Sequence, residues 1–144
     1  MSSAPLMLDS GPLSMLVHPT LDLTFAGWFA AAVAADQSIV IPEIADYELR
    51  RKLLHKDFRR SLARLDSLET SLAYLAIDTA TLRRAAELWA AARHRGHPTA
   101  PPDALDGDVI LAAQAEAIGA IVVTEDLKDL SQFVPARRWT EISF

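Results

Sequence analysis

The chain has 144 residues, of which 51% are hydrophobic and 23% charged, and its formal net charge is −5. This balance is typical of one globular domain covering residues 1–144 and excludes a disordered chain. The sequence contains no cysteine, which excludes disulfides and thiolate metal sites. Because no Lys or Arg precedes residue 50 and the most hydrophobic stretch, 23–35, is too short to span a bilayer, we expect a cytoplasmic protein with no membrane partner.

The first half of the chain alternates short apolar runs with helical patterns. Residues 5–8 predict a buried strand that ends at Asp9, and a turn then leads into a helix that continues to Val17. The elements expected next are a helix at 21–35, a strand at 38–42, a helix at 43–54 and a helix at 57–68.

The second half repeats the alternation. The elements expected first are a strand at 71–77 and a helix that is capped by Asp78 or Thr79 and ends near Gly96. A proline-rich loop at 97–102 leads to a helix at 103–117, which Gly119 ends. A strand at 121–124, a turn at 125–129 and an edge strand at 139–144 follow. This order predicts a three-layer α/β/α sandwich with a mainly parallel sheet of four to five strands and right-handed crossovers.

Half of the cations lie in one short segment. Residues 50–64 contain seven of the fourteen Lys and Arg and carry a formal charge of +6, which leaves −11 for the rest of the chain. Such a segment indicates either a docking place for a polyanion or acidic partner, or simply a solvated helix face. The candidate residues for contacts with RNA or a partner are Arg50, Arg51, Lys52 and Lys56.

Carboxylates follow or flank several of the expected elements. Asp9 closes the first strand, Glu48 lies on the helix after the second, Asp108 opens a later helix, and Asp126 follows the strand at 121–124. Because the carboxyl ends of parallel strands face one crevice, we expect these acids to converge there. Converging carboxylates stay ionised near neutral pH only beside a cation, and Mg²⁺ or Mn²⁺ suits such oxygen ligands.

Each acid also has an ordinary structural interpretation. Asp9 and Asp106 or Asp108 are suited to cap helices, Asp126 to form a turn, and Glu48 to pair with Lys52 one turn along its helix. Independent capping does not account for acids after both the first and the last parallel strands, so we favour a joint role. Within it we prefer Asp108 as a metal ligand and Asp106 as a cap or supporting acid.

These motifs resemble those of the PIN domain, the ribonuclease fold of VapC-type toxins, over nearly the whole chain. The matching segments are Asp9-Ser10 at the end of the first strand, Tyr47-Glu48-Leu49 after the second, the helix start Asp108-Val109-Ile110-Leu111-Ala112-Ala113 and the turn Thr124-Glu125-Asp126. The sequence departs from the family at Gly11, where many relatives have a polar residue, and at Leu130, where an aromatic residue is usual.

The resemblance implies a metal-dependent endoribonuclease that hydrolyses RNA phosphodiester bonds, the toxin of a type II toxin-antitoxin pair, with an antitoxin partner and a homodimeric state. It implies that the catalytic acids are Asp9, Glu48, Asp108 and Asp126. The metal ligands would be Asp9, Asp108 and Asp126, and the supporting residues Ser10, Asp106 and Thr124. The alternative is a PIN-like module that binds RNA or protein without cleaving, its acids serving as caps. A zinc site at His94 and His97 is a weaker interpretation, because no cysteine or second histidine pair accompanies them.

Overall fold

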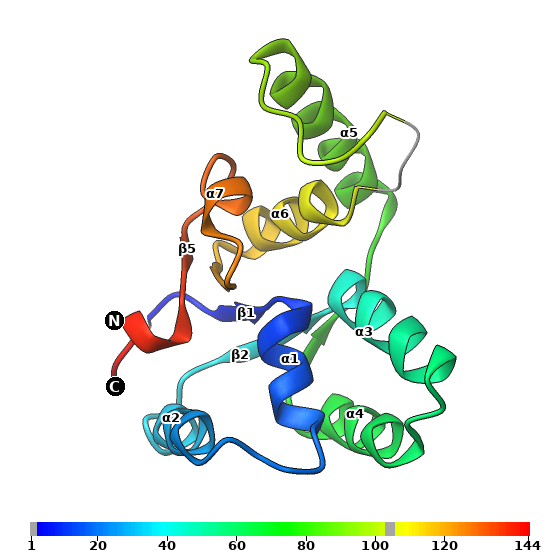
Figure 1. The fold of residues 1–144 in the computed structure, drawn as a ribbon. Coiled ribbons are helices and arrows are strands. Elements are labelled where there is room, and N and C mark those ends of the chain that lie inside the picture. The colour runs from blue at the N-terminus through cyan, green and yellow to red at the C-terminus, as the bar shows by residue number, and fades with distance from the viewer. Residues whose placement is uncertain (1–2, 103–105) are drawn as a thin grey trace.

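Five short strands form one fully parallel sheet in the order β3-β2-β1-β4-β5 in the computed structural model, which describes residues 3–102 and 106–144 (Figure 1). The strands are β1 (Leu6–Leu8), β2 (Ile39–Pro42), β3 (Ala73–Leu75), β4 (Ile121–Val123) and β5 (Ala136–Arg137). The helices are α1 (Ser10–Val17), α2 (Leu23–Ala34), α3 (Glu43–His55), α4 (Arg59–Ser71), α5 (Thr79–His94), α6 (Gly107–Ile118) and α7 (Leu127–Leu130), followed by a 3₁₀ turn at Trp139–Glu141. The predicted three-layer parallel architecture is confirmed.

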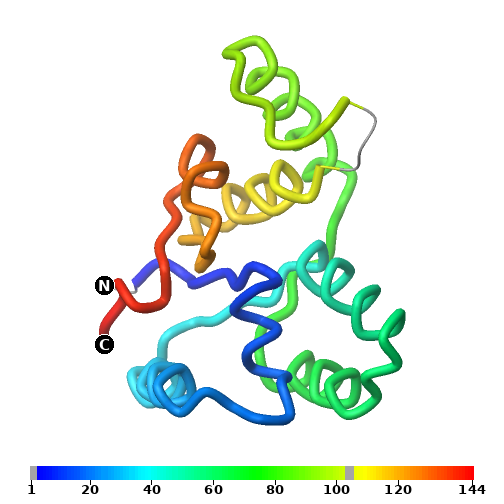
Figure 2. Tube along the Cα trace, viewed as in Figure 1, coloured from blue at the N-terminus to red at the C-terminus, as the bar shows by residue number. Residues whose placement is uncertain are grey.

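The helices cover the sheet on both faces. Helices α1 to α4 lie on one face and α5 to α7 on the other, so the chain covers one side before β3 and the other side after it (Figure 2). Alternate side chains of β1 serve the two layers, because successive residues of a strand point to opposite faces. Met7 packs with α5 and α6, whereas Leu6 and Leu8 pack with α1 to α4, and all three are buried.

The position of β1 in the sheet determines where the acids meet. Leu6 is paired with Ile39 of β2 on one side and with Ile121 of β4 on the other. Beyond this register the backbone N–H of Asp9 donates to the carbonyl oxygen of Val123 at 3.0 Å. The segments that leave β1 and β4 are therefore side by side, although more than a hundred residues separate them in the sequence.

The prediction of an edge strand at 139–144 is wrong. The edge strand is β5, and Trp139–Glu141 forms a 3₁₀ turn. The ring of Trp139 packs 5.3 Å from that of Phe25, centroid to centroid, and Trp28 Nε1 donates to the carbonyl oxygen of Ile142 at 2.9 Å. Burial of these aromatic rings against α2 draws the segment out of the plane of the sheet.

The predicted ends of the later helices are largely confirmed. Asp78 caps α5 by accepting from the backbone N–H of Thr81 at 2.8 Å, and Gly119 ends α6 with a φ of 64°. The predicted start of α6 at Asp103 lies outside the described residues, and the helix begins at Gly107. None of the helices within 3–102 and 106–144 combines the length and apolarity of a membrane span.

Candidate metal centre

Asp9 directly follows the central strand β1 and is held between the start of α1 and the segment after β4. Its Oδ1 accepts from the backbone N–H of Ser10 at 2.7 Å, and its Oδ2 accepts from the hydroxyl of Thr124 at 2.8 Å. Thr124 is 1% exposed, and its hydroxyl oxygen also accepts from the backbone N–H of Asp126 at 2.9 Å. One buried hydroxyl therefore fixes the carboxylate that follows β1 and the backbone of the acid that follows β4.

Three carboxylates meet beside Asp9. One oxygen each from Asp108, Asp126 and Asp129 lies within 4.8 Å of the other two, and all three residues are half-buried. We call this group the acidic trio. Asp126 also caps α7 by accepting from the backbone N–H of Asp129 at 3.4 Å. Oxygen donors at this separation fit a hard divalent cation such as Mg²⁺ or Mn²⁺, and no nitrogen or sulfur ligand is among them.

Burial and repulsion within the trio raise the pKa of two of its members. Burial, then the charge of Asp126, then that of Asp9 raise the pKa of Asp108 to about 7. Burial and the charge of Asp126 also raise the pKa of Asp129. Carboxylates that repel one another in this way gain most from a shared cation, which would restore their ionised form.

Asp129 is not among the residues that the sequence predicts for the site, although it closes the expected turn at 125–129 that contains Asp126. In the structure, Asp126 and Asp129 stand three residues apart across the single turn of α7. That spacing places two side chains on neighbouring parts of a helix surface. The sequence signal that could have indicated Asp129 is a pair of acids three residues apart directly after a buried strand.

Glu48 reaches the same region from α3. Burial and the charge of Asp9 raise the pKa of Glu48, whereas Arg51 and Lys52 act in the opposite direction. Its carboxylate lies against the first residue of α6, where a Cβ added to Gly107 would stand 2.8 Å from Glu48 Oε2. The carboxylate thus occupies space that only a glycine leaves open.

Asp106 has the contacts of a buried cap. Its Oδ1 accepts from the backbone N–H of Asp108 at 3.1 Å and of Val109 at 3.4 Å, and Thr99 donates its hydroxyl to Oδ2. Asp106 is 6% exposed. It therefore fixes the start of α6, and with it the backbone that carries Asp108.

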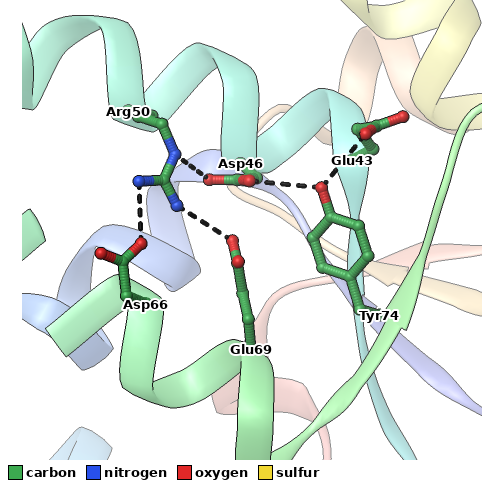
Figure 3. A network of polar contacts seen from close by, with 6 residues as sticks. All are labelled: Glu43, Asp46, Arg50, Asp66, Glu69 and Tyr74. Carbon is green, nitrogen blue, oxygen red and sulfur yellow. Dashed lines mark hydrogen bonds and ion pairs between the residues drawn. The ribbon is translucent and has the colours of Figure 1, made fainter. Parts of the chain in front are cut away.

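The predicted cationic residues in α3 and directly after it have different surroundings. Arg50 is enclosed in a polar network of α3, α4 and β3, whose members are Glu43, Asp46, Arg50, Asp66, Glu69 and Tyr74 (Figure 3). Arg51 stacks over the ring of Tyr47 at 5.2 Å, and Lys56 over that of Phe58 at 5.8 Å. Arg51 and Lys52 act on Glu48, as described above, whereas Arg50 is engaged with three carboxylates.

His94 and His97 are exposed and belong to no group of three metal-ligating side chains within the described parts of the chain. The one group of that kind found there is the acidic trio. The structure thus brings Asp9, Glu48, Asp106, Asp108 and Asp126 to one region and adds Asp129 to them.

Comparison with solved structures identifies the fold. A chain of VapBC2 from Rickettsia felis, solved bound to a DNA fragment from the promoter, superposes with a TM-score of 0.76 at 18% identity, covering 93% of this chain and 98% of the other. For FitAcB from Neisseria gonorrhoeae the TM-score is 0.71 at 18% identity, with 95% and 99% covered. For DNA-bound VapBC from Salmonella typhimurium it is 0.70 at 19% identity, with 95% and 99% covered. At these identities the likeness is one of fold.

No curated protein matches the sequence. The PIN domain family, in contrast, matches residues 7–133, a range that contains every acid of the candidate site from Asp9 to Asp129. The chain belongs to the PIN domain family.

Proposed function

We propose that the chain is a metal-dependent endoribonuclease that hydrolyses RNA phosphodiester bonds, and that it is the toxin of a type II toxin-antitoxin pair. The observation that carries the proposal is the acidic trio, whose carboxylate oxygens lie within 4.8 Å of one another. PIN domains are nucleases as a family, and the similar folds of VapBC and FitAcB support the assignment to a toxin.

The site residues divide into those that would hold Mg²⁺ or Mn²⁺ and those that orient them. Asp108, Asp126 and Asp129 offer the closest oxygens, and Asp9 adds a fourth carboxylate steadied by Ser10 and Thr124. When bound, the ion would lower the pKa of a water and neutralise charge on the phosphodiester. Asp106 keeps the backbone before Asp108 in place.

Glu48 has a separate role in the proposal. It approaches the centre from α3 and lies against Gly107, at the start of the helix that carries Asp108. Its pKa is raised by burial, so it binds a proton more readily than an exposed glutamate. We assign Glu48 to orienting the attacking water and receiving a proton from it.

The surface also suits protein partners. A cavity of about 560 Å³ between α1, α3 and α4 is lined by apolar residues such as Val17, Leu53 and Phe58, and would receive an apolar segment of an antitoxin. On another face Tyr47 and Leu82, each 49% exposed, flank a shallower apolar cavity that would pair with a second copy. Light scattering of the chain alone checks the homodimer, and a monomeric mass at micromolar concentration would contradict it.

Hydrolysis of labelled RNA tests the enzymatic proposal. We expect cleavage with Mg²⁺, none with EDTA, and a loss of about 100-fold or more for Asp108→Asn, since even partners of metal ligands commonly contribute 10- to 100-fold. Glu125→Gln is the matched control, because it removes a charge next to Asp126 on an exposed side chain paired with Arg138. Its activity should stay within about twofold of the wild type.

Two outcomes would decide against the proposal. Cleavage that resists both EDTA and Asp108→Asn would reject the metal centre. Binding of RNA without cleavage of any RNA offered would favour the alternative, a PIN-like module that binds RNA or protein without catalysis.

A further inference from the structure

A second cavity adjoins the acidic trio. It has a volume of about 500 Å³ and lies between the C-terminal end of α5 and α7. Its lining includes Arg95, His97, Lys128, Asp129 and Gln132. Asp129 belongs to the trio as well, so the cavity and the candidate metal centre share a wall.

Contacts between the two elements hold this cavity in shape. Gln132 Oε1 accepts from Arg95 Nη2 at 2.8 Å, and Gln132 Nε2 donates to the carbonyl oxygen of His97 at 3.3 Å. The guanidinium of Arg95 also lies 5.8 Å from the ring centroid of Phe133. Gly96, with a φ of 76°, makes the turn that leads from α5 into this wall. Arg95 is therefore oriented before any ligand arrives.

The charge of the centre explains why a substrate would need this cavity. The whole chain carries −5, and four carboxylates, including that of Asp9, gather where the phosphodiester would have to lie. A polyanion approaching them is repelled unless cations stand close by. Arg50 cannot supply much of that attraction, because its guanidinium pairs with Asp46, Asp66 and Glu69.

Two pairs of other cations act near the acids, one pair from α3 and one from the cavity. Arg51 and Lys52 act on Glu48 from α3. Arg95 and Lys128 line the cavity next to Asp129, and the charge of Lys128 acts on that carboxylate. An RNA strand at the acidic centre would thus have cations of α3 and of the cavity close to it.

We propose that this cavity binds a nucleotide of single-stranded RNA next to the scissile phosphate, with Arg95 and Lys128 contacting backbone phosphates and Gln132 and His97 contacting the base or ribose. The proposal rests on the proposed ribonuclease function and specifies its substrate. Pockets of about 300–1,000 Å³ accept small ligands of this size. A pocket takes in a base only when that base is unstacked, which favours single strands, loops and ends over duplex RNA.

Binding without cleavage isolates this proposal from catalysis. In an Asp108→Asn background with EDTA, the affinity for a short labelled single-stranded RNA is measured by fluorescence anisotropy over a series of salt concentrations. We expect Arg95→Gln and Lys128→Gln together to weaken binding at least tenfold. The slope of log affinity against log salt should fall by about 0.7 for each phosphate that the variant no longer neutralises. Arg95→Lys, which keeps the charge, should retain more affinity than Arg95→Gln.

Arg83→Gln is the matched control, since it removes an exposed arginine from α5, the helix that Arg95 follows, at a position outside the cavity lining. It should leave affinity and slope unchanged, and thermal melts should show that all variants fold. Unchanged RNA affinity and slope in the Arg95 and Lys128 double variant would overturn the proposal. So would loss of binding to a glutamate-rich peptide in that variant with RNA binding intact, which would assign the cavity to an acidic protein segment.

The RNA-binding role of the cavity and the proposed ribonuclease activity can fail independently in these experiments. A wild-type protein that fails to cleave RNA, but whose RNA affinity falls in the double variant, would reject the nuclease and support the cavity. Cleavage by the wild type together with unchanged RNA affinity in the double variant would support the nuclease and reject the cavity as an RNA-binding site.

Discussion

At the scale of single residues, the hydroxyl of Thr124 connects two acids that lie at opposite ends of the chain. It donates to Asp9 and accepts from the backbone of Asp126, which explains why a threonine two residues before an aspartate suits this turn. Sequence patterns predicted Asp9, Asp108 and Asp126, because each stands at the end of a strand or the start of a long helix. Asp129 was missed because α7 has one turn, too few residues to show a helical period.

Gly107 gives a prediction in which activity falls although the stability of the fold is kept. Alanine favours a helix over glycine by up to about 1 kcal/mol, so Gly107→Ala should not destabilise the fold. Its new Cβ, 2.8 Å from Oε2 of Glu48, should displace that carboxylate and lower RNA hydrolysis at least tenfold. Urea unfolding and the RNA assay measure the two effects.

The control for this substitution is Gly27→Ala on α2, where an added Cβ meets nothing within 4 Å. It should show a similar or larger gain in stability with unchanged hydrolysis. Equal activity in the two variants would mean that the close approach of Gly107 does not determine where Glu48 acts.

At the scale of elements, α3 presents two faces with separate tasks. Glu48 faces α6, whereas Asp46 and Arg50 face α4 and β3 (Figure 3). Helical spacing alone places Asp46, two residues before Glu48, on a different face of α3. It did not predict the partners of Arg50, because Asp66 and Glu69 come from α4, and only packing of the two helices brings them near. A cation in a sequence shows its charge but not whether its neighbours neutralise it.

The network predicts that Arg50 matters more to stability than other cations of the same segment. Arg50→Met leaves Asp46, 8% exposed, without its ion pair. Because the arginine is 30% exposed, we expect a loss of about 1–3 kcal/mol in the free energy of unfolding, below the cost of breaking a fully buried pair. Arg59→Met, which removes a pair whose side chains are 84% and 73% exposed, should cost under about 0.5 kcal/mol. Urea denaturation compares them, and equal losses would contradict a structural role for the network.

At the scale of the whole molecule, the alternation of strands and helices was enough to predict a parallel three-layer fold. It could not predict the edge of the sheet, because two residues of β5 carry almost no pattern and the aromatic residues after it resemble a strand. The rings of Phe25, Trp28 and Trp139 form a cluster instead. Contacts between remote segments decide such cases, and a local pattern does not contain them.

The stability of the metal-free protein should depend on pH through its acids. The pKa of Asp108 is raised to about 7, and a carboxyl with a higher pKa in the folded state stabilises the fold at low pH and loses this contribution as pH rises through the folded pKa. We therefore expect the melting temperature in EDTA to fall between about pH 5 and pH 8. Mg²⁺ should restore more stability at the upper end, because a cation binds ionised carboxylates.

Two variants show which carboxyl group causes the pH dependence of stability and which causes the gain from Mg²⁺. Asp108→Asn should remove both part of the pH dependence and most of the gain from Mg²⁺. Glu69, whose pKa is also raised to about 7 by burial and then by Asp46, lies in the α3–α4 network. Glu69→Gln should therefore weaken the pH dependence and leave the gain from Mg²⁺ intact. A full Mg²⁺ gain in Asp108→Asn would contradict the assignment.

The central position of β1 has a consequence for the chain during its synthesis. Its neighbour β4 is translated more than a hundred residues later, and Asp126 and Asp129 follow β4. A nascent polypeptide therefore holds an incomplete set of these acids until Asp129 has been added. The acidic trio cannot form on the growing chain before that point, so cation binding by the trio requires a chain synthesised past α7.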